Sequence, residues 1–70
     1  MSSTDIQNLS TDEIRAKLHD AREELMNLRF QLAMGGLTDY TRLRFTRRTI
    51  ARYLTAINER EAAARKESES

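Results

Sequence analysis

The sequence predicts an all-α fold, an antiparallel two-helix hairpin (αα-hairpin) with a coiled-coil-like seam. The 70 residues contain no Pro and only two Gly, which stand together as Gly35-Gly36, so the chain has turn chemistry for one turn. Apolar residues recur at helical spacing on both sides of this pair. Because so short a connection places two helices side by side and antiparallel, residues 9–64 are expected to form one hairpin domain.

The first helix is expected over residues 11–34, and its start is marked by a capping signal. Ser10 is a good N-cap residue, and Glu13 follows three residues later, as in a capping box. Leu9 and Ile14 stand where a hydrophobic staple forms. Together these residues predict that the helix begins directly after Ser10.

The apolar residues of this helix form one seam with a spacing of 4-3-4-3-4 residues. Such a spacing is typical of a helix that packs along its length against another helix. The helix is expected to end where Gly35 takes a left-handed conformation, in a turn over residues 35–38. The seam residues are Ile14, Leu18, Ala21, Leu25, Leu28 and Leu32.

The second helix is expected over residues 39–63, with Thr38 or Asp39 as its cap. Its inner face is marked by Leu43, Ile50, Leu54 and Ile57, with Thr46 between them. Residues 65–70 are rich in Ser and Glu and are expected to form a frayed charged tail. Residues 1–8 show no periodicity and are expected to form a flexible N-terminal segment.

The second helix carries an unusual run of arginines on its outer side. At 100° per residue, Arg44, Arg48 and Arg52 lie about 120°, 160° and 200° from Ile50, respectively. Arg47 lies on the flank and Thr55 joins the outer group; these five residues are called the arginine face. Counting Arg42 as well, residues 31–58 contain five Arg and a single acidic residue, Asp39. Solvated helix faces usually carry charges of both signs. The pattern favours a phosphate-binding surface and leaves plain solvation as the alternative.

The second half of the first helix is apolar on two sides. One side is the seam, and the other consists of four residues that we call the apolar line. A helix that is apolar on two sides is typically buried on both, and a hairpin covers only one of them. The pattern favours a second contact surface over scattered exposed side chains. Phe45 of the second helix either extends this surface or stacks on a base or ribose. The apolar line consists of Met26, Phe30, Ala33 and Met34.

Several classes of function are excluded by what the sequence lacks. With no Cys and one isolated His19, the chain offers no disulfide, no metal site and no nucleophile–base pair. Two helices also enclose no pocket for a catalytic site, so no enzyme, cofactor or small-molecule substrate is expected. No apolar run approaches the ~20 residues that span a bilayer. The N-terminal residues lack a secretory signal pattern, which indicates a cytoplasmic protein without membrane contact.

The small size of the chain predicts a partner. Below about 70–80 residues a single core seldom stabilises a fold by more than ~3–5 kcal/mol. Because disulfides and metal sites are excluded, we expect the chain to oligomerise or to dock onto something larger.

Two stretches of the sequence, correctly spaced, carry a resemblance to a known family. The first is Leu-Arg-Phe-Gln-Leu-Ala-Met-Gly-Gly-Leu over residues 28–37, and the second combines Arg44, Arg47-Arg48, Ile50-Ala51-Arg52 and Thr55. They resemble the pattern Leu-Arg-x-Gln-x-Ala-x-Gly-x-Leu, then Arg-x-x-Arg-Arg/Lys-x-Ile-Ala-Arg-x-x-Thr, of the bacterial large-subunit ribosomal protein twenty-nine family. The likeness covers residues 9–61.

The resemblance implies a structural, non-enzymatic constituent of the large ribosomal subunit in the cytoplasm. It implies a hairpin bound to large-subunit rRNA near the peptide exit tunnel, beside ribosomal protein twenty-three, where nascent-chain factors dock. The apolar line would then meet the adjacent protein. Carried over residue by residue, the expected RNA contacts are Arg29, Gln31, Arg44, Arg47, Arg48, Arg52 and Thr55.

Two alternatives from other classes stay open at this point. One is a homodimeric four-helix bundle in which the apolar line pairs with its own copy. The other is an adaptor whose arginine face binds an acidic protein rather than nucleic acid.

Overall fold

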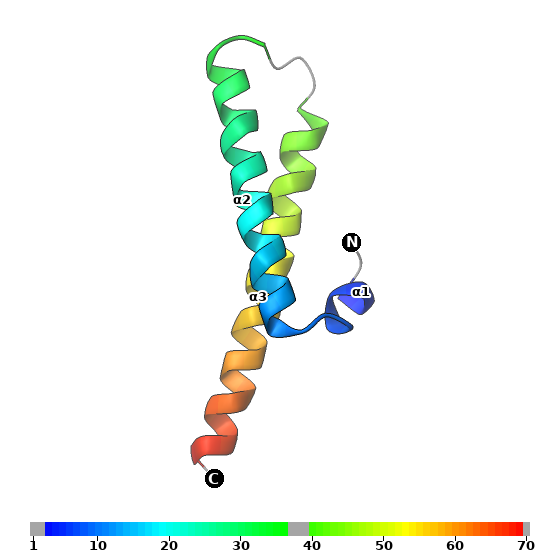
Figure 1. The fold of residues 1–70 in the computed structure, drawn as a ribbon, viewed down its shortest axis with the longest axis vertical. Coiled ribbons are helices and arrows are strands. Elements are labelled where there is room, and N and C mark those ends of the chain that lie inside the picture. The colour runs from blue at the N-terminus through cyan, green and yellow to red at the C-terminus, as the bar shows by residue number, and fades with distance from the viewer. Residues whose placement is uncertain (1–2, 37–39, 70) are drawn as a thin grey trace.

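The computed structural model describes residues 3–36 and 40–69, which form three helices and no strand. These are α1 (Ser3–Gln7), α2 (Thr11–Ala33) and α3 (Thr41–Glu69). α2 and α3 pack side by side and run in opposite directions, while α1 lies against α3 (Figure 1). The molecule is elongated, with extents of 53 × 20 × 15 Å. The predicted all-α hairpin is confirmed, and α1 is added to it.

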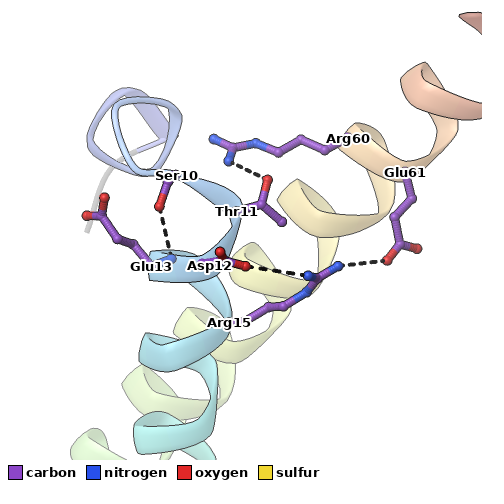
Figure 2. A network of polar contacts seen from close by, with 7 residues as sticks. All are labelled: Ser10, Thr11, Asp12, Glu13, Arg15, Arg60 and Glu61. Atoms are coloured by element: carbon purple, nitrogen blue, oxygen red, sulfur yellow. Dashed lines mark hydrogen bonds and ion pairs between the residues drawn. The ribbon is translucent and has the colours of Figure 1, made fainter.

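The start of α2 follows the capping signal in the sequence. Ser10 has an extended backbone, with φ −69° and ψ 161°, and its Oγ accepts a hydrogen bond of 3.1 Å from the backbone N–H of Glu13 (Figure 2). This bond satisfies one of the donors that a helix N-terminus leaves unpaired. Leu9 packs against the same core cluster as Ile14, which is fully buried. The first turn of α2 is therefore fixed by one polar and one apolar contact.

The end of α2 is a Schellman motif built on the two glycines. Gly35 has φ +78°, and its N–H donates to the carbonyl of Leu32 at 3.1 Å. The N–H of Gly36 donates to the carbonyl of Gln31 at 2.8 Å, which completes the paired bonds of this motif. The predicted caps of the next helix, Thr38 and Asp39, lie outside the described residues, and α3 begins at Thr41.

The predicted seam forms the α2–α3 contact over most of its length. On α2, Ile14, Leu18 and Leu28 are buried, whereas Leu32 near the turn is 37% exposed. The predicted inner face of α3 is half-buried or buried throughout its five residues. Tyr53, which was not among them, is also buried, so the centre of this face lies between Ile50 and Tyr53.

The N-terminal segment, for which the sequence showed no periodicity, contains a short helix; residues 1–2 of the segment that we expect to be flexible lie outside the described residues. Residues 3–7 are helical, and Ile6 is only 3% exposed. Ile6 packs in one cluster with Ile14, Tyr53 and Ile57, where it covers a part of α3 that α2 leaves open. A five-residue helix is too short to show a period in the sequence, and Ile6 is the buried apolar side chain through which it packs on the core.

Arg60 of α3 holds this N-terminal segment in place. Its guanidinium donates to the carbonyl oxygen of Leu9 at 2.7 Å and to Oγ1 of Thr11 at 3.1 Å. Longer contacts of 3.5 Å reach the carbonyls of Ile6 and Gln7, at the C-terminus of α1. A cation at this end suits the negative end of the helix dipole. The Arg60–Thr11 contact is drawn in Figure 2.

The C-terminal part of α3 also differs from the expectation of a helix end at 63 and a frayed tail over 65–70. α3 continues to Glu69 and extends past the start of α2 (Figure 1). Nothing after Gly36 breaks a helix, and residues 62–64 are three alanines, the strongest helix formers. Arg15 of α2 bridges Glu61 at 3.6 Å and Asp12 at 3.8 Å, at the level where α2 begins (Figure 2).

Candidate nucleic-acid interface

The N-terminal part of α3 presents three exposed arginines that line one shallow hollow. Arg44, Arg47 and Arg48 line this hollow together with Ala51. None of the three guanidinium groups has an acidic partner among residues 3–36 and 40–69. A cluster of unneutralised guanidinium groups repels itself unless an anion is supplied, and phosphate fits their forked geometry.

Arg42, in the same part of α3, has a different environment. Its guanidinium forms an ion pair with the carboxylate of Glu24 on α2. This pair ties the two helices together on one flank of the hairpin. Arg42 therefore has a structural role, whereas the guanidinium groups of its neighbours on α3 have no acidic partner among the described residues.

Arg52 and Thr55 lie at a second hollow, between α3 and α1. Both are exposed, and the hollow is also lined by Ile6 and Gln7 of α1 and by Glu59. The hydroxyl of Thr55 donates to the carbonyl of Ala51 at 2.9 Å, so its oxygen is left to accept hydrogen bonds. The far end of the arginine face is thus more mixed in charge than the Arg44–Arg48 end.

The two RNA-contact candidates on α2 point in different directions. Arg29 is exposed and lies at a third hollow, with Arg22 from α2 and Ile50 from α3. Gln31 is also exposed, but it lies two residues after Arg29 and so points about 200° away from it around the helix axis. The structure therefore brings Arg29 to the α2–α3 groove and places Gln31 on the other flank.

The apolar line is exposed along its whole length. Met26 is 71% exposed, Phe30 66% and Met34 71%, and Ala33 is exposed as well. Phe45 on α3 is 59% exposed. Large apolar side chains gathered in one half of a small protein mark a contact surface more often than scattered ones do.

Sequence reasoning missed Arg22, Tyr53 and Arg60. Arg22 is exposed and has no acidic partner among the described residues. The available signal was the spacing of Arg15, Arg22 and Arg29, seven residues apart on one side of α2. Arg60 had no such signal, because its partners, the carbonyl of Leu9 and the hydroxyl of Thr11, are about 50 residues away in the sequence.

Neither a cluster of metal-ligating side chains nor a membrane-spanning helix is found in the described residues. Within residues 3–36 and 40–69 no three His, Asp or Glu side chains gather where they could hold a metal ion. None of the helices in the described part of the chain combines the length and apolar character that crossing a bilayer requires.

Comparisons with known proteins give a matching family model and several relatives. The family model described as "Ribosomal L29 protein" matches residues 4–60. A protein of Symbiobacterium thermophilum, named large ribosomal subunit protein uL29, is 48% identical over 67 residues, which are 96% of each chain. A protein of the same name from Bacillus cytotoxicus is 51% identical over 61 residues, or 87% of this chain and 92% of the relative. Its namesake from Bacillus cereus strain B4264 shows the same values.

Proposed function

This chain belongs to the ribosomal L29 protein family, and from that premise we propose that its arginine face binds the rRNA of the large ribosomal subunit. The family is a structural, non-enzymatic component of the large subunit. The chain accordingly has a structural role in the ribosome, where rRNA and other ribosomal proteins are its partners.

The observation that carries the proposal is the cluster of unpaired guanidinium groups on α3. Arg44, Arg47 and Arg48 are exposed, share one hollow and have no acidic partner in the described part of the chain. Each binds a backbone phosphate and releases the counterions condensed there, which favours association. Because phosphate contacts carry no sequence information, the hairpin recognises the shape of a folded RNA rather than its bases.

The other predicted contacts extend this surface in two directions. Arg52 adds a guanidinium at the α1 side of α3, and the oxygen of Thr55 accepts a hydrogen bond from a ribose 2′-OH. Arg29 adds a cation from α2. Gln31, on the opposite flank, would contact a separate RNA segment.

The apolar line provides the protein contact in this proposal. Met26, Phe30, Ala33 and Met34 pack against a neighbouring ribosomal protein, which the family resemblance identifies as number twenty-three at the exit of the peptide tunnel. Nascent-chain factors would meet the chain at the same place. Residues 9–64 act there as a single domain, with α1 as an added brace.

The experiment is sucrose-gradient fractionation of a native lysate with immunodetection of this chain. We expect it to migrate with the large subunit at low salt and to move to the top of the gradient after ribonuclease treatment. A chain that stays at the top at every salt concentration contradicts the proposal.

Ribonuclease treatment in this gradient tests one of the two alternatives, and sedimentation of the purified chain tests the other. Binding to an acidic protein predicts a complex that survives ribonuclease. A homodimeric bundle predicts that sedimentation of the free protein gives twice the chain mass of 8.1 kDa, whereas we expect the mass of a monomer.

A further inference from the structure

One basic site on the surface lies outside the arginine face and joins both long helices. It is lined by Arg22, Arg29 and Leu25 of α2 and by Ile50 of α3. Met26, the first residue of the apolar line, completes the lining, so the hollow borders the surface proposed for the protein contact. We call these five residues the cross-helix hollow. Arg22 has no part in the function proposed so far.

The rotational positions of these residues place the cross-helix hollow on the same side of the hairpin as Arg47. At 100° per residue, Arg22 and Arg29 lie about 60° and 40° clockwise from Leu25, viewed from the N-terminus of α2. Viewed in the same way along α3, Arg47 lies about 60° clockwise from Ile50. When two right-handed helices run antiparallel, residues that are rotated by similar angles and in the same sense from the inner face of their helix point to the same side of the hairpin. Arg22 and Arg29 of α2 and Arg47 of α3 therefore lie on one side, which we call the shared face.

The printed ion pairs provide an independent check of this geometry. Glu24 lies about 100° anticlockwise from Leu25, and Arg42 lies about 80° anticlockwise from Ile50. These two residues form an ion pair, as residues on a common flank should. The acid of α2 nearest to the seam is therefore on the flank opposite Arg22.

The charge on the shared face is positive and unneutralised. Arg22, Arg29, Arg44 and Arg47 have no acidic partner within residues 3–36 and 40–69. Arg15, one heptad before Arg22, is neutralised by Asp12 and Glu61. The arginines of α2 that lack an acidic partner are thus Arg22 and Arg29, which lie on the same side of the hairpin as Arg47 of α3. Arg15, further toward the start of α2, is not one of them.

We infer that Arg22 is a phosphate-contacting residue and that the RNA backbone crosses from α3 onto α2 over the cross-helix hollow. The inference rests on the proposed function, because it extends the same RNA surface. Two rows of guanidinium groups, separated by a helix–helix distance of about 8–10 Å, hold successive parts of one RNA chain across the hairpin. Leu25 and Ile50, which share the lining, carry no side-chain acceptor that would compete with phosphate for the guanidinium groups of Arg22 and Arg29.

The test measures binding of the purified full chain to protein-free large-subunit rRNA at several salt concentrations. Replacing Arg22 with Gln removes one phosphate contact, so the slope of log K against log salt should become shallower by about 0.9. Raising salt from 50 to 200 mM should then weaken the unchanged protein about 3.5-fold more than Arg22→Gln. Arg22→Lys keeps the charge and should keep the slope.

Arg15→Gln is the matched control. It removes the same charge from the same side of α2, but its guanidinium is already held by Asp12 and Glu61. We expect the slope of this variant to equal that of the unchanged protein. Because Arg22 is exposed, helical content by circular dichroism should be the same in both variants.

A second measurement requires no substitution. Phenylglyoxal modifies accessible guanidinium groups, and bound rRNA should protect Arg22 from it while Arg15 reacts equally with and without RNA. Full reactivity of Arg22 in the complex overturns the inference.

The outcomes separate this inference from the proposed function. If Arg44→Gln makes the slope shallower and Arg22→Gln does not, the crossing path is wrong and the function stands. If the unchanged protein does not bind the rRNA at all, both are wrong. If Arg22→Gln weakens binding to polyglutamate and leaves RNA binding unchanged, the hollow takes an acidic protein and the inference is overturned.

Discussion

Removing the side chain of Arg60 should detach the N-terminal segment from the hairpin. The structure gives this guanidinium two well-formed hydrogen bonds, of 2.7 Å to the carbonyl of Leu9 and of 3.1 Å to Oγ1 of Thr11. Two further contacts at 3.5 Å are too long to contribute much. Arg60→Ala therefore removes two charged hydrogen bonds and leaves their half-buried acceptors unpaired.

The size of the effect follows from these contacts. A hydrogen bond to a charged group contributes about 1.5–3 kcal/mol when buried, and a partly exposed one contributes less because water competes. Ile6, buried in the same segment, adds about 2 kcal/mol when it stays docked. We expect the free energy of unfolding to fall by about 2–3 kcal/mol for Arg60→Ala, since the segment loses its tether and part of its burial.

The assay is urea unfolding of the purified chain, followed by circular dichroism at 222 nm. Arg65→Ala is the matched control, because Arg65 is exposed and lies five residues further along the same helix. Its effect should stay within about 0.5 kcal/mol, as is usual for surface substitutions. Arg60→Lys should recover only part of the loss, since a single ammonium group does not reproduce the guanidinium fork. Equal stabilities of Arg60→Ala and Arg65→Ala would refute the tether.

Three further predictions concern the RNA surface, the apolar line and the turn. Arg44→Gln should reduce the slope of log K against log salt for rRNA binding by about 0.9. Arg42→Gln should leave this slope unchanged, because the guanidinium of Arg42 is paired with Glu24. Equal slopes for the two variants would contradict the distinction between paired and unpaired arginines on α3. Phe30→Ser should lower the amount of the chain retained in large subunits at high salt and leave binding to protein-free rRNA unaltered, and a loss in both assays would assign Phe30 to the RNA. Gly35→Ala should cost about 1 kcal/mol in urea unfolding because of its φ of +78°, and Gly36→Ala should cost less, since an added Cβ would meet only the carbonyl of Gln31 at 3.8 Å; the reverse order would disprove the Schellman ending.

The hairpin could be predicted because its determinants are local and periodic. The cap at Ser10 and the left-handed Gly35 each depend on a few neighbouring residues, and both are found as expected. The seam of α2 needed only the regular spacing of its apolar residues. The helix at residues 3–7 had no such signal, because Ile6 is docked by side chains 47–51 residues away in the sequence.

The candidate interface shows where reasoning from a single helix stops. The angular positions on α3 placed Arg44 and Arg48 on its outer side and Arg47 on its flank, and all three are exposed. The same angles, however, treat each helix separately and give no reason to connect Arg22 with Arg47. That connection needs only one additional rule, that antiparallel right-handed helices bring equal rotations to one face, and the sequence was sufficient to apply it. The pairing of Arg42 with Glu24 is of another kind, because it depends on how far α3 slides along α2, and no spacing within either helix determines that distance.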